Sequence, residues 1–387
     1  MKKKELKKIN EPLLEWFDKN ARVLPWRERP EPYRVWVSEI MLQQTRVEAV
    51  KPFFARFMEA LPNAAALAVC PEERLLKLWE GLGYYNRVRN MQIAAQTIVS
   101  EYGGELPADY EALLKLKGIG SYTAGAIASI AYGIPVPAVD GNVLRVISRV
   151  LANDADITKQ SVKKEIEELL GEVMPKDRAG AYNQALMELG ALVCVPNGMA
   201  KCEICPLTEI CQARKQNMVM ELPKKTPKKG RRIEKRTVLI IKDGDRVAIH
   251  RRPNKGLLAG LYELPNEMEA LSQEEVLALL KERGFAPIRI KKLVQAKHIF
   301  SHVEWQMTGY AALVEEPGYQ KDGVYVFRDA NGQENRYLFI EPEKTQEQYP
   351  IPAAFAAYTE YLQIKLGQNK YKEEKNHENF ISGNTML

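Results

Sequence analysis

Apolar residues in the first half of the chain recur at the three- and four-residue spacing of amphipathic helices. One such run contains Ile40, Leu42, Val47, Val50, Phe54 and Phe57. Strand-like alternation is nearly absent before residue 211. Prolines stand near the expected helix starts, at Pro25, Pro30, Pro32, Pro62, Pro71 and Pro107. We therefore predict that residues from about 5 to 211 form a succession of helices.

The pattern changes after residue 211. The stretch KQNMVMELPKKTPKKGRRIEKR has no helical period and predicts an extended, solvated linker over Gln212–Arg236. From Thr237 onward, TVLIIK, DRVAIHRR, YELP, VEWQMTGYAALVEE and VYVF favour short strands. QEEVLALLKERG predicts one amphipathic helix that Gly284 ends. The second half is therefore predicted as an α+β domain to about residue 366, followed by a polar, disordered tail.

Length and composition set broad limits on the fold and on the partner. The chain has 387 residues, too many for one ordinary core, so two domains are expected. Its net charge of +6 is a mild indication of a polyanionic partner such as nucleic acid. No apolar run is long enough to cross a membrane, and the basic N-terminus has no apolar segment behind it. We expect a cytoplasmic protein without a membrane partner.

Four of the five cysteines lie close together in the sequence. Cys194, Cys202, Cys205 and Cys211 are separated by seven, two and five residues, a spacing that indicates a metal centre. Zinc and a four-iron cluster both accept four thiolates, so the spacing alone leaves both open. Cys70 is expected to be a buried or half-buried free thiol.

Two helical patterns meet at Gly118-Ile119-Gly120, and Asp140 follows the second of them. Glycines permit a tight turn and a close approach of backbone amides to an anion such as a DNA phosphate. An ordinary helical hairpin has the same pattern. Asp140 stands where a helix N-cap belongs, and that role can coexist with a catalytic one.

The segment LLKLKGIGSYTAGAIASIAYGIPVPAVDGNV resembles the helix-hairpin-helix and Gly/Pro-Asp signature of the endonuclease III superfamily of DNA glycosylases. From about Trp16 to about Phe327 the chain is more closely similar to the MutY family, adenine glycosylases that act opposite 8-oxoguanine. This resemblance implies that Gly118 and Gly120 hold the DNA backbone. It also implies that Asp140 faces the sugar of an extruded nucleotide.

Cleavage of an N-glycosidic bond needs an acid for the departing base and a carboxylate for the cationic sugar. Glu39 lies in the apolar sequence YRVWVSEIMLQQTRV, where burial would raise its pKa, although a surface glutamate fits the pattern too. The resemblance makes Glu39 the general acid and assigns supporting roles to Tyr122 and Asn142. Bifunctional relatives carry a lysine at the position of Tyr122, so we expect a monofunctional enzyme that uses water.

The resemblance also implies two sets of DNA contacts. The adenine pocket would comprise Trp26, Arg27, Leu42, Val47 and Gln184. Contacts to the duplex and to the opposite base would come from Gln44, Thr45, Tyr84 and the reading loop Phe300, Ser301 and His302. From the residues alone, Tyr84 would be a core aromatic and the loop side chains ordinary surface groups.

KGLLAGLYELP resembles the start of a MutT-like (Nudix) domain. The helix that follows lacks the REx₂EE arrangement of a nucleotide hydrolase, so we expect a lesion reader. The resemblance also makes the four cysteines ligands of a [4Fe–4S] cluster. The chain departs from the family here, because seven residues rather than six separate Cys194 from Cys202.

The predicted fold is multidomain: an all-α glycosylase domain with an iron–sulfur cluster, then an α+β MutT-like domain. The helical domain covers 1–211, with a six-helix barrel at about 26–134 and a second lobe from 1–25 and 135–211. A basic linker (212–235), the MutT-like domain (236–366) and the tail (367–387) follow. We expect a monomer that acts on duplex DNA with adenine opposite 8-oxoguanine or guanine. A glycosylase for another base and a non-enzymatic DNA-binding protein are the alternatives.

Overall fold

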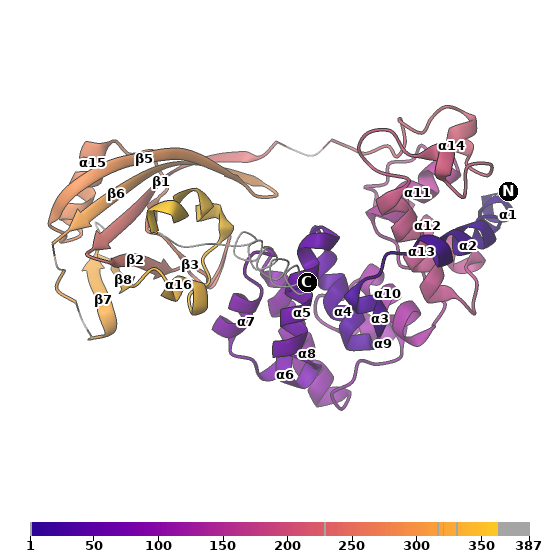
Figure 1. Ribbon diagram of the computed structural model, residues 1–387, viewed down its shortest axis with the longest axis horizontal. Helices are drawn as coiled ribbons and strands as arrows, with labels where there is room; N and C mark the ends of the chain where they lie inside the picture. Colours follow the sequence, from indigo (N-terminus) through magenta and orange to yellow (C-terminus); the bar gives the residue numbers. More distant parts are fainter. Residues whose placement is uncertain (1, 228–229, 316, 320, 330–331, 363–387) are drawn as a thin grey trace, which may run out of the picture. The chain divides into compact units, whose positions relative to one another are not determined.

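The computed structural model describes residues 2–227, 230–315, 317–319, 321–329 and 332–362 (Figure 1). The chain forms two compact units. Unit 1 comprises Met1–Cys70 and Arg87–Lys228, whereas unit 2 comprises Pro71–Asn86 and Lys229–Leu387. The helical pattern of Pro71–Asn86 does not indicate this grouping from the sequence alone. The predicted tail, 367–387, lies outside the described residues.

Unit 1 is built from helices, which confirms the predicted fold class for this part of the chain (Figure 1). They are α1 (Lys2–Lys7), α2 (Asn10–Asn20), α3 (Pro25–Glu28), α4 (Pro32–Leu42), α5 (Val47–Ala60), α6 (Ala64–Val69), α8 (Asn86–Glu101), α9 (Tyr110–Lys115), α10 (Ser121–Tyr132), α11 (Gly141–Val150), α12 (Gln160–Val173), α13 (Ala179–Leu192), the 3₁₀ turn η1 (Cys202–Ile204) and α14 (Gln212–Lys215). None of the described helices is long and apolar enough to cross a membrane.

One core of unit 1 joins segments that are far apart in the sequence. Leu6, Leu13 and Phe17 from α1 and α2 pack with residues of α11, α12 and α13, such as Ile147 and Leu186. Helix α10 contacts both α4, the helix of Glu39, and α13, the last long helix of the unit. Tyr122, in the first turn of α10, donates to Glu39, so this turn lies beside α4.

Unit 2 is a mixed sheet with helices, as the α+β prediction requires (Figure 1). Its strands are β1 (Arg232–Asp243), β2 (Arg246–Arg251), β3 (Tyr262–Glu263), β4 (Asn266–Glu267), β5 (Pro287–Ile299), β6 (Val303–Val314), β7 (Val324–Arg328) and β8 (Glu334–Ile340). Its helical elements are α7 (Glu72–Leu78), α15 (Gln273–Glu282), α16 (Lys344–Glu347) and the 3₁₀ segments η2 (Lys321–Gly323) and η3 (Ala353–Leu362).

The strand order is β5-β6-β1-β2-β8-β7, with β3 beside β2 and β4 beside β1. Strand β1 runs parallel to β6 and antiparallel to β2. It is covered on both faces: Val238 and Ile240 join a core with η3, while Leu239 and Ile241 join a core with α15. Burial on both faces explains why TVLII is an unbroken apolar run rather than an alternating one.

The expected linker is only partly extended and solvated. Gln212–Lys215 forms α14, and β1 already begins at Arg232. Leu222 is buried, and the amide of Ile157 donates to the carbonyl of Lys224 at 3.1 Å. The first part of the linker therefore packs on unit 1, because it contains apolar side chains as well as lysines and prolines.

Candidate active site

Glu39 lies in α4, a helix that is buried along most of its length. Glu39 is only 6% exposed to solvent, and the neighbouring Trp36 and Ile40 are buried as well. Burial raises the pKa of Glu39 to about 7, and the charge of Asp140 adds to this effect. A hydrogen bond from Tyr122 and the charge of Arg27 oppose it. Glu39 therefore holds a proton over part of the neutral pH range.

Tyr122 is in the first turn of α10, directly after the glycine turn. Its hydroxyl donates to Oε2 of Glu39, and it lies 3.2 Å from Sδ of Met187 on α13. Burial, and then the charges of Glu39 and Asp140, raise the pKa of Tyr122 well above its usual value. Tyr122 is therefore a neutral donor that holds the carboxyl group of Glu39 in place.

Asp140 is the N-cap of α11, which confirms the structural role predicted for it. Its Oδ1 accepts the amides of Asn142 and Val143 at 2.9 and 2.8 Å, and its Oδ2 accepts Nδ2 of Asn142 at 2.7 Å. Burial raises the pKa of Asp140, whereas these hydrogen bonds and Arg145 favour the carboxylate. The capping bonds fix the orientation of Asp140. Asn142 lies at the same site because it follows Asp140 by two residues and donates to it.

Arg145, which is not among the predicted site residues, supports this arrangement from the same helix. Its Nη2 donates to Oδ1 of Asn142 and to the carbonyl of Gly190, both at 2.8 Å. Its Nε donates to the carbonyl of Cys194 at 2.8 Å. A Cβ at Gly190 would stand 2.6 Å from Cβ of Asn142, so glycine is required there. A buried arginine in the apolar run VLRVISRV was the available signal.

Arg27 belongs to a buried ion network rather than standing alone. Its Nη2 donates to Oε2 of Glu188 at 3.0 Å, and Nε of Arg22 donates to Oε1 of Glu188 at 2.7 Å. Burial favours the neutral form of Glu188, but the hydrogen bonds from Arg22 and Arg27 lower its pKa to about 2. Neither Arg22 nor Glu188 was singled out from the sequence.

The other residues predicted for the adenine pocket lie on several elements. Trp26 is buried. Its ring packs edge-to-face with that of Phe54, with 5.4 Å between the ring centroids. Leu42 and Val47 are half-buried at the end of α4 and the start of α5. Gln184 donates to the carbonyl of Gly180 at 3.3 Å, one turn back on its own helix. Their contact with adenine stays a prediction.

Two turns next to the buried site carry the predicted DNA contacts of unit 1. Gln44 and Thr45 follow α4, and Gln44 is exposed with a positive φ of 60°. Arg87 holds this turn, because its Nη1 donates to the carbonyls of Ile40 and Gln43, each at 2.7 Å.

The glycine turn lies between α9 and α10. Gly118 has a φ of 81°, and a Cβ there would stand 2.8 Å from Cβ of Asn90. Gly120 is the N-cap of α10, so its neighbours present backbone amides at the helix start. Lys117 and Gly118 line a small cavity together with Ile40, Gln43, Arg87, Asn90 and Met91.

In unit 2, the structure brings Tyr84 and Ser301 together. The hydroxyl of Tyr84 is 3.0 Å from Oγ of Ser301, and Tyr84 is 47% exposed with a φ of 48°. The reading loop joins β5 to β6, with Ser301 and His302 exposed. The ring of Phe300 packs edge-to-face with that of Trp305, with 4.8 Å between the ring centroids, so Phe300 anchors the loop. Tyr84 is therefore not the core aromatic that its pattern alone favours.

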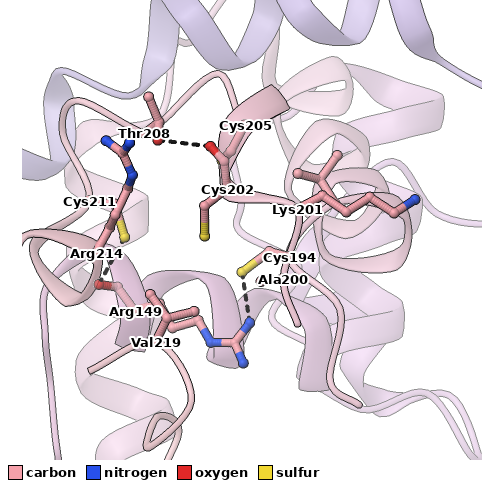
Figure 2. Close-up of a pocket in the computed structure, with 11 residues that line it drawn as sticks. Arg149, Cys194, Ala200, Lys201, Cys202, Cys205, Thr208, Cys211, Arg214 and Val219 are labelled. Atoms are coloured by element: carbon pink, nitrogen blue, oxygen red, sulfur yellow. Dashed lines mark hydrogen bonds between the residues drawn. The ribbon is translucent and has the colours of Figure 1, made fainter. Parts of the chain in front are cut away.

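The four clustered cysteines line one cavity (Figure 2). The cavity is also lined by Arg149, Lys201, Arg214 and Val219. Nη1 of Arg149 donates to Sγ of Cys194 at 3.2 Å. No group of three or more Cys, His, Asp or Glu side chains within the described ranges is arranged to hold a single metal ion. Cys70 is buried, as expected.

Comparisons with known proteins agree with this architecture. Residues 37–172 match the model of the HhH-GPD superfamily of base excision DNA repair proteins, and residues 236–361 match that of the NUDIX domain. The adenine DNA glycosylase of Rattus norvegicus is 35% identical over 78% of this chain and 70% of its own length. That of Arabidopsis thaliana is 33% identical over 82% of this chain and 59% of its own length.

Among solved structures, a thermostable thymine-DNA glycosylase is similar to the helical part. It is 27% identical, with a TM-score of 0.50, and the match covers 56% of this chain and 97% of that one. The domain matches and the identity to full-length relatives support the same assignment. This chain is therefore a member of the adenine DNA glycosylase family, enzymes of base excision repair that hydrolyse N-glycosidic bonds.

Proposed function

We propose that this protein is a monofunctional glycosylase that removes adenine paired with 8-oxoguanine or guanine. The observation that carries the proposal is the arrangement of Glu39, Tyr122 and Asp140. A buried acid with a pKa of about 7 and a second, hydrogen-bonded carboxyl group are what cleavage of a glycosidic bond requires.

In the proposed mechanism, Glu39 donates its proton to an imidazole-ring nitrogen of adenine as the bond to the sugar breaks. The bonding electrons leave with the base, and positive charge develops on the sugar. The carboxylate of Asp140 stabilises that charge, oriented by Asn142 and by the two backbone amides at the start of α11. Water then adds to the sugar and loses a proton to Glu39.

The residue at the start of α10 supports hydrolysis without a covalent enzyme intermediate. Tyr122 occupies the position where bifunctional relatives have a lysine, and its neutral hydroxyl is engaged with Glu39. Lys163, on α12, donates to Oγ of Ser121 at 3.1 Å and lies 3.5 Å from Glu167. The amine of Lys163 is therefore engaged with Ser121 and Glu167 rather than with the Glu39 carboxyl group.

Recognition of the pair is proposed to come from both units. Trp26, Arg27, Leu42, Val47 and Gln184 would surround the extruded adenine. Gln44 and Thr45 would fill the space it leaves, while Gly118 and Gly120 hold the backbone. Tyr84 would stack beside the opposite base, and Ser301 would hydrogen-bond the ring N–H that oxidation creates. The exposure of Tyr84, Ser301 and His302 supports this assignment.

We also propose that Cys194, Cys202, Cys205 and Cys211 hold a [4Fe–4S] cluster. All four line one cavity (Figure 2). Four thiolates are the ligand set of such a cluster, and the family resemblance favours iron over the zinc that the same ligands accept. The cluster would cross-link the loop after α13, and hydrolysis needs no electron from it. Iron quantification and visible absorbance distinguish it from zinc.

Single-turnover excision on three duplexes tests the proposed function. Adenine opposite 8-oxoguanine should be released fastest, adenine opposite guanine more slowly, and thymine opposite guanine not at all. The sugar product should form without strand cleavage until alkali is added. Release of thymine but not adenine would show a different glycosylase, and binding without release of any base would show a non-enzymatic DNA-binding protein.

A further inference from the structure

A short segment of the helical sequence belongs to unit 2. Pro71–Asn86 contains α7 and the loop that leads to Tyr84, and it groups with Lys229–Leu387 rather than with the helices on either side of it. The contacts that hold this segment are therefore the contacts that position Tyr84 relative to the reading loop.

Glu80 makes a buried contact between this segment and the rest of unit 2. It is 2% exposed, and its two carboxylate oxygens have different partners. Oε1 accepts the amide of Ile351 at 2.8 Å, and Oε2 accepts Nζ of Lys77 at 2.6 Å. Lys77 also donates to the carbonyl of Thr345 at 2.5 Å. We call Lys77, Glu80, Thr345 and Ile351 the clasp.

Glu80 of the clasp lies directly before the loop that carries Tyr84. Trp79 is fully buried, and its Nε1 donates to the carbonyl of Gly83 at 3.1 Å. Gly83 and Tyr84 both have positive φ values, of 68° and 48°. A non-glycine residue in that region costs energy and persists only where its surroundings hold it. Trp79, next to Glu80, therefore fixes the loop at Gly83, the residue that precedes Tyr84.

The same segment has a second, weaker connection to unit 2. Arg251 lies 3.9 Å from Glu72 and 3.6 Å from Glu73. All three side chains are substantially exposed to solvent, so these ion pairs contribute little. They provide a control, because they join the same two parts of unit 2 through other glutamates of the same segment.

We propose that Glu80 is a positioning residue that determines specificity, because it holds the Tyr84 loop and the Phe300–His302 loop in one fixed arrangement. This inference rests on the proposed function, in which Tyr84 and Ser301 recognise the oxidised base. Tyr84 then enters the duplex only together with Ser301, because the two loops move as one body. The hydrogen-bond distance between the Tyr84 and Ser301 hydroxyls shows the arrangement that the clasp maintains.

The test compares E80A and E80Q with the double control E72Q/E73Q in the full-length, cluster-loaded protein. Single-turnover rate constants are measured for adenine opposite 8-oxoguanine and opposite guanine. E80A should reduce the ratio of the two at least about tenfold and change the rate opposite guanine less than about twofold. E80Q keeps an acceptor for the Ile351 amide and should retain part of the ratio. The control should retain all of it.

A double variant separates positioning from a loss of folding. If Glu80 acts through the two loops, S301A should already remove most of the ratio, and E80A/S301A should reduce it by less than about twofold more. Multiplied losses would contradict the inference, as would an unchanged ratio in E80A. Thermal unfolding identifies a variant that has simply lost unit 2. Wild-type protein without any preference for 8-oxoguanine would instead refute the proposed function.

Discussion

Glu39 and Glu188 are both buried carboxyl groups, yet their pKa values move in opposite directions. Glu39 accepts a hydrogen bond from one neutral donor, Tyr122, and its pKa rises to about 7 because the effect of burial dominates. Glu188 has two guanidinium partners, and its pKa falls to about 2. The number and charge of the partners therefore decide which carboxyl group carries a proton and which one carries a structural charge.

Glu39 predicts the alkaline side of the pH dependence. Because the acid form must donate a proton, the single-turnover rate constant should fall as pH rises above about 7. Y122F removes a hydrogen bond that lowers the pKa of Glu39, so this limb should move to higher pH. The measurement is excision under enzyme excess from pH 5 to 9. A limb that Y122F leaves in place or moves to lower pH would contradict the assignment.

Glu188 predicts an acid-sensitive part of the folding stability. Its pKa is about 2 in the folded protein and 4.5 ordinarily, so its contribution is present above pH 4.5 and lost as pH falls toward 2. The loss amounts to about 3 kcal/mol. Urea unfolding across this range should show it in the wild type and not in E188Q, which is also less stable at neutral pH. Parallel pH profiles for the two proteins would refute this.

At the scale of elements, the candidate active site lies where α4, α10 and α11 begin or end. The capping of α11 by Asp140 and the glycine turn before α10 were predictable, because both rest on local chemistry. The burial of Glu39 was predictable from its apolar neighbours. The network of Arg145, Asn142 and Gly190 was not, because it depends on the packing of α11 against α13.

The glycine turn allows a matched pair of substitutions. G118A adds a Cβ at a φ of 81° and 2.8 Å from Cβ of Asn90, whereas G120A adds one with open space around it. G118A should lower the free energy of unfolding by about 1–3 kcal/mol, and G120A by less than about 0.5 kcal/mol. Chemical unfolding followed by circular dichroism measures both. Equal losses would show that the turn is not the constraint.

At the scale of the whole molecule, the sequence predicts two domains and a linker but not the grouping of Pro71–Asn86 with unit 2. That grouping depends on buried contacts of Glu80 and Lys77, which no helical periodicity records. The linker differs from its prediction for a similar reason. Leu222 is buried, and Nε of Arg149 donates to its carbonyl at 2.9 Å.

The anchored part of the linker can be tested by proteolysis. The hydroxyl and amide of Thr226 both donate to Oδ2 of Asp156. T226V removes one of these bonds, so trypsin should cut at Lys224 and Lys225 several times faster. T97V is the matched control, because the hydroxyl of Thr97 bonds only to its own helix, at Ile93. Equal cutting of T226V and wild type would contradict the anchoring of this part.

The central claim is that Glu39 and Asp140 perform the chemistry while the fold around them binds DNA. The direct measurement is single-turnover excision of adenine opposite 8-oxoguanine by wild type, E39Q and D140N, together with the dissociation constant of each for a duplex with an uncleavable adenine analogue. Both substitutions should slow excision at least about a thousandfold and leave the dissociation constant within about threefold. Excision that persists in either variant, or binding lost in step with excision in both, would contradict the claim.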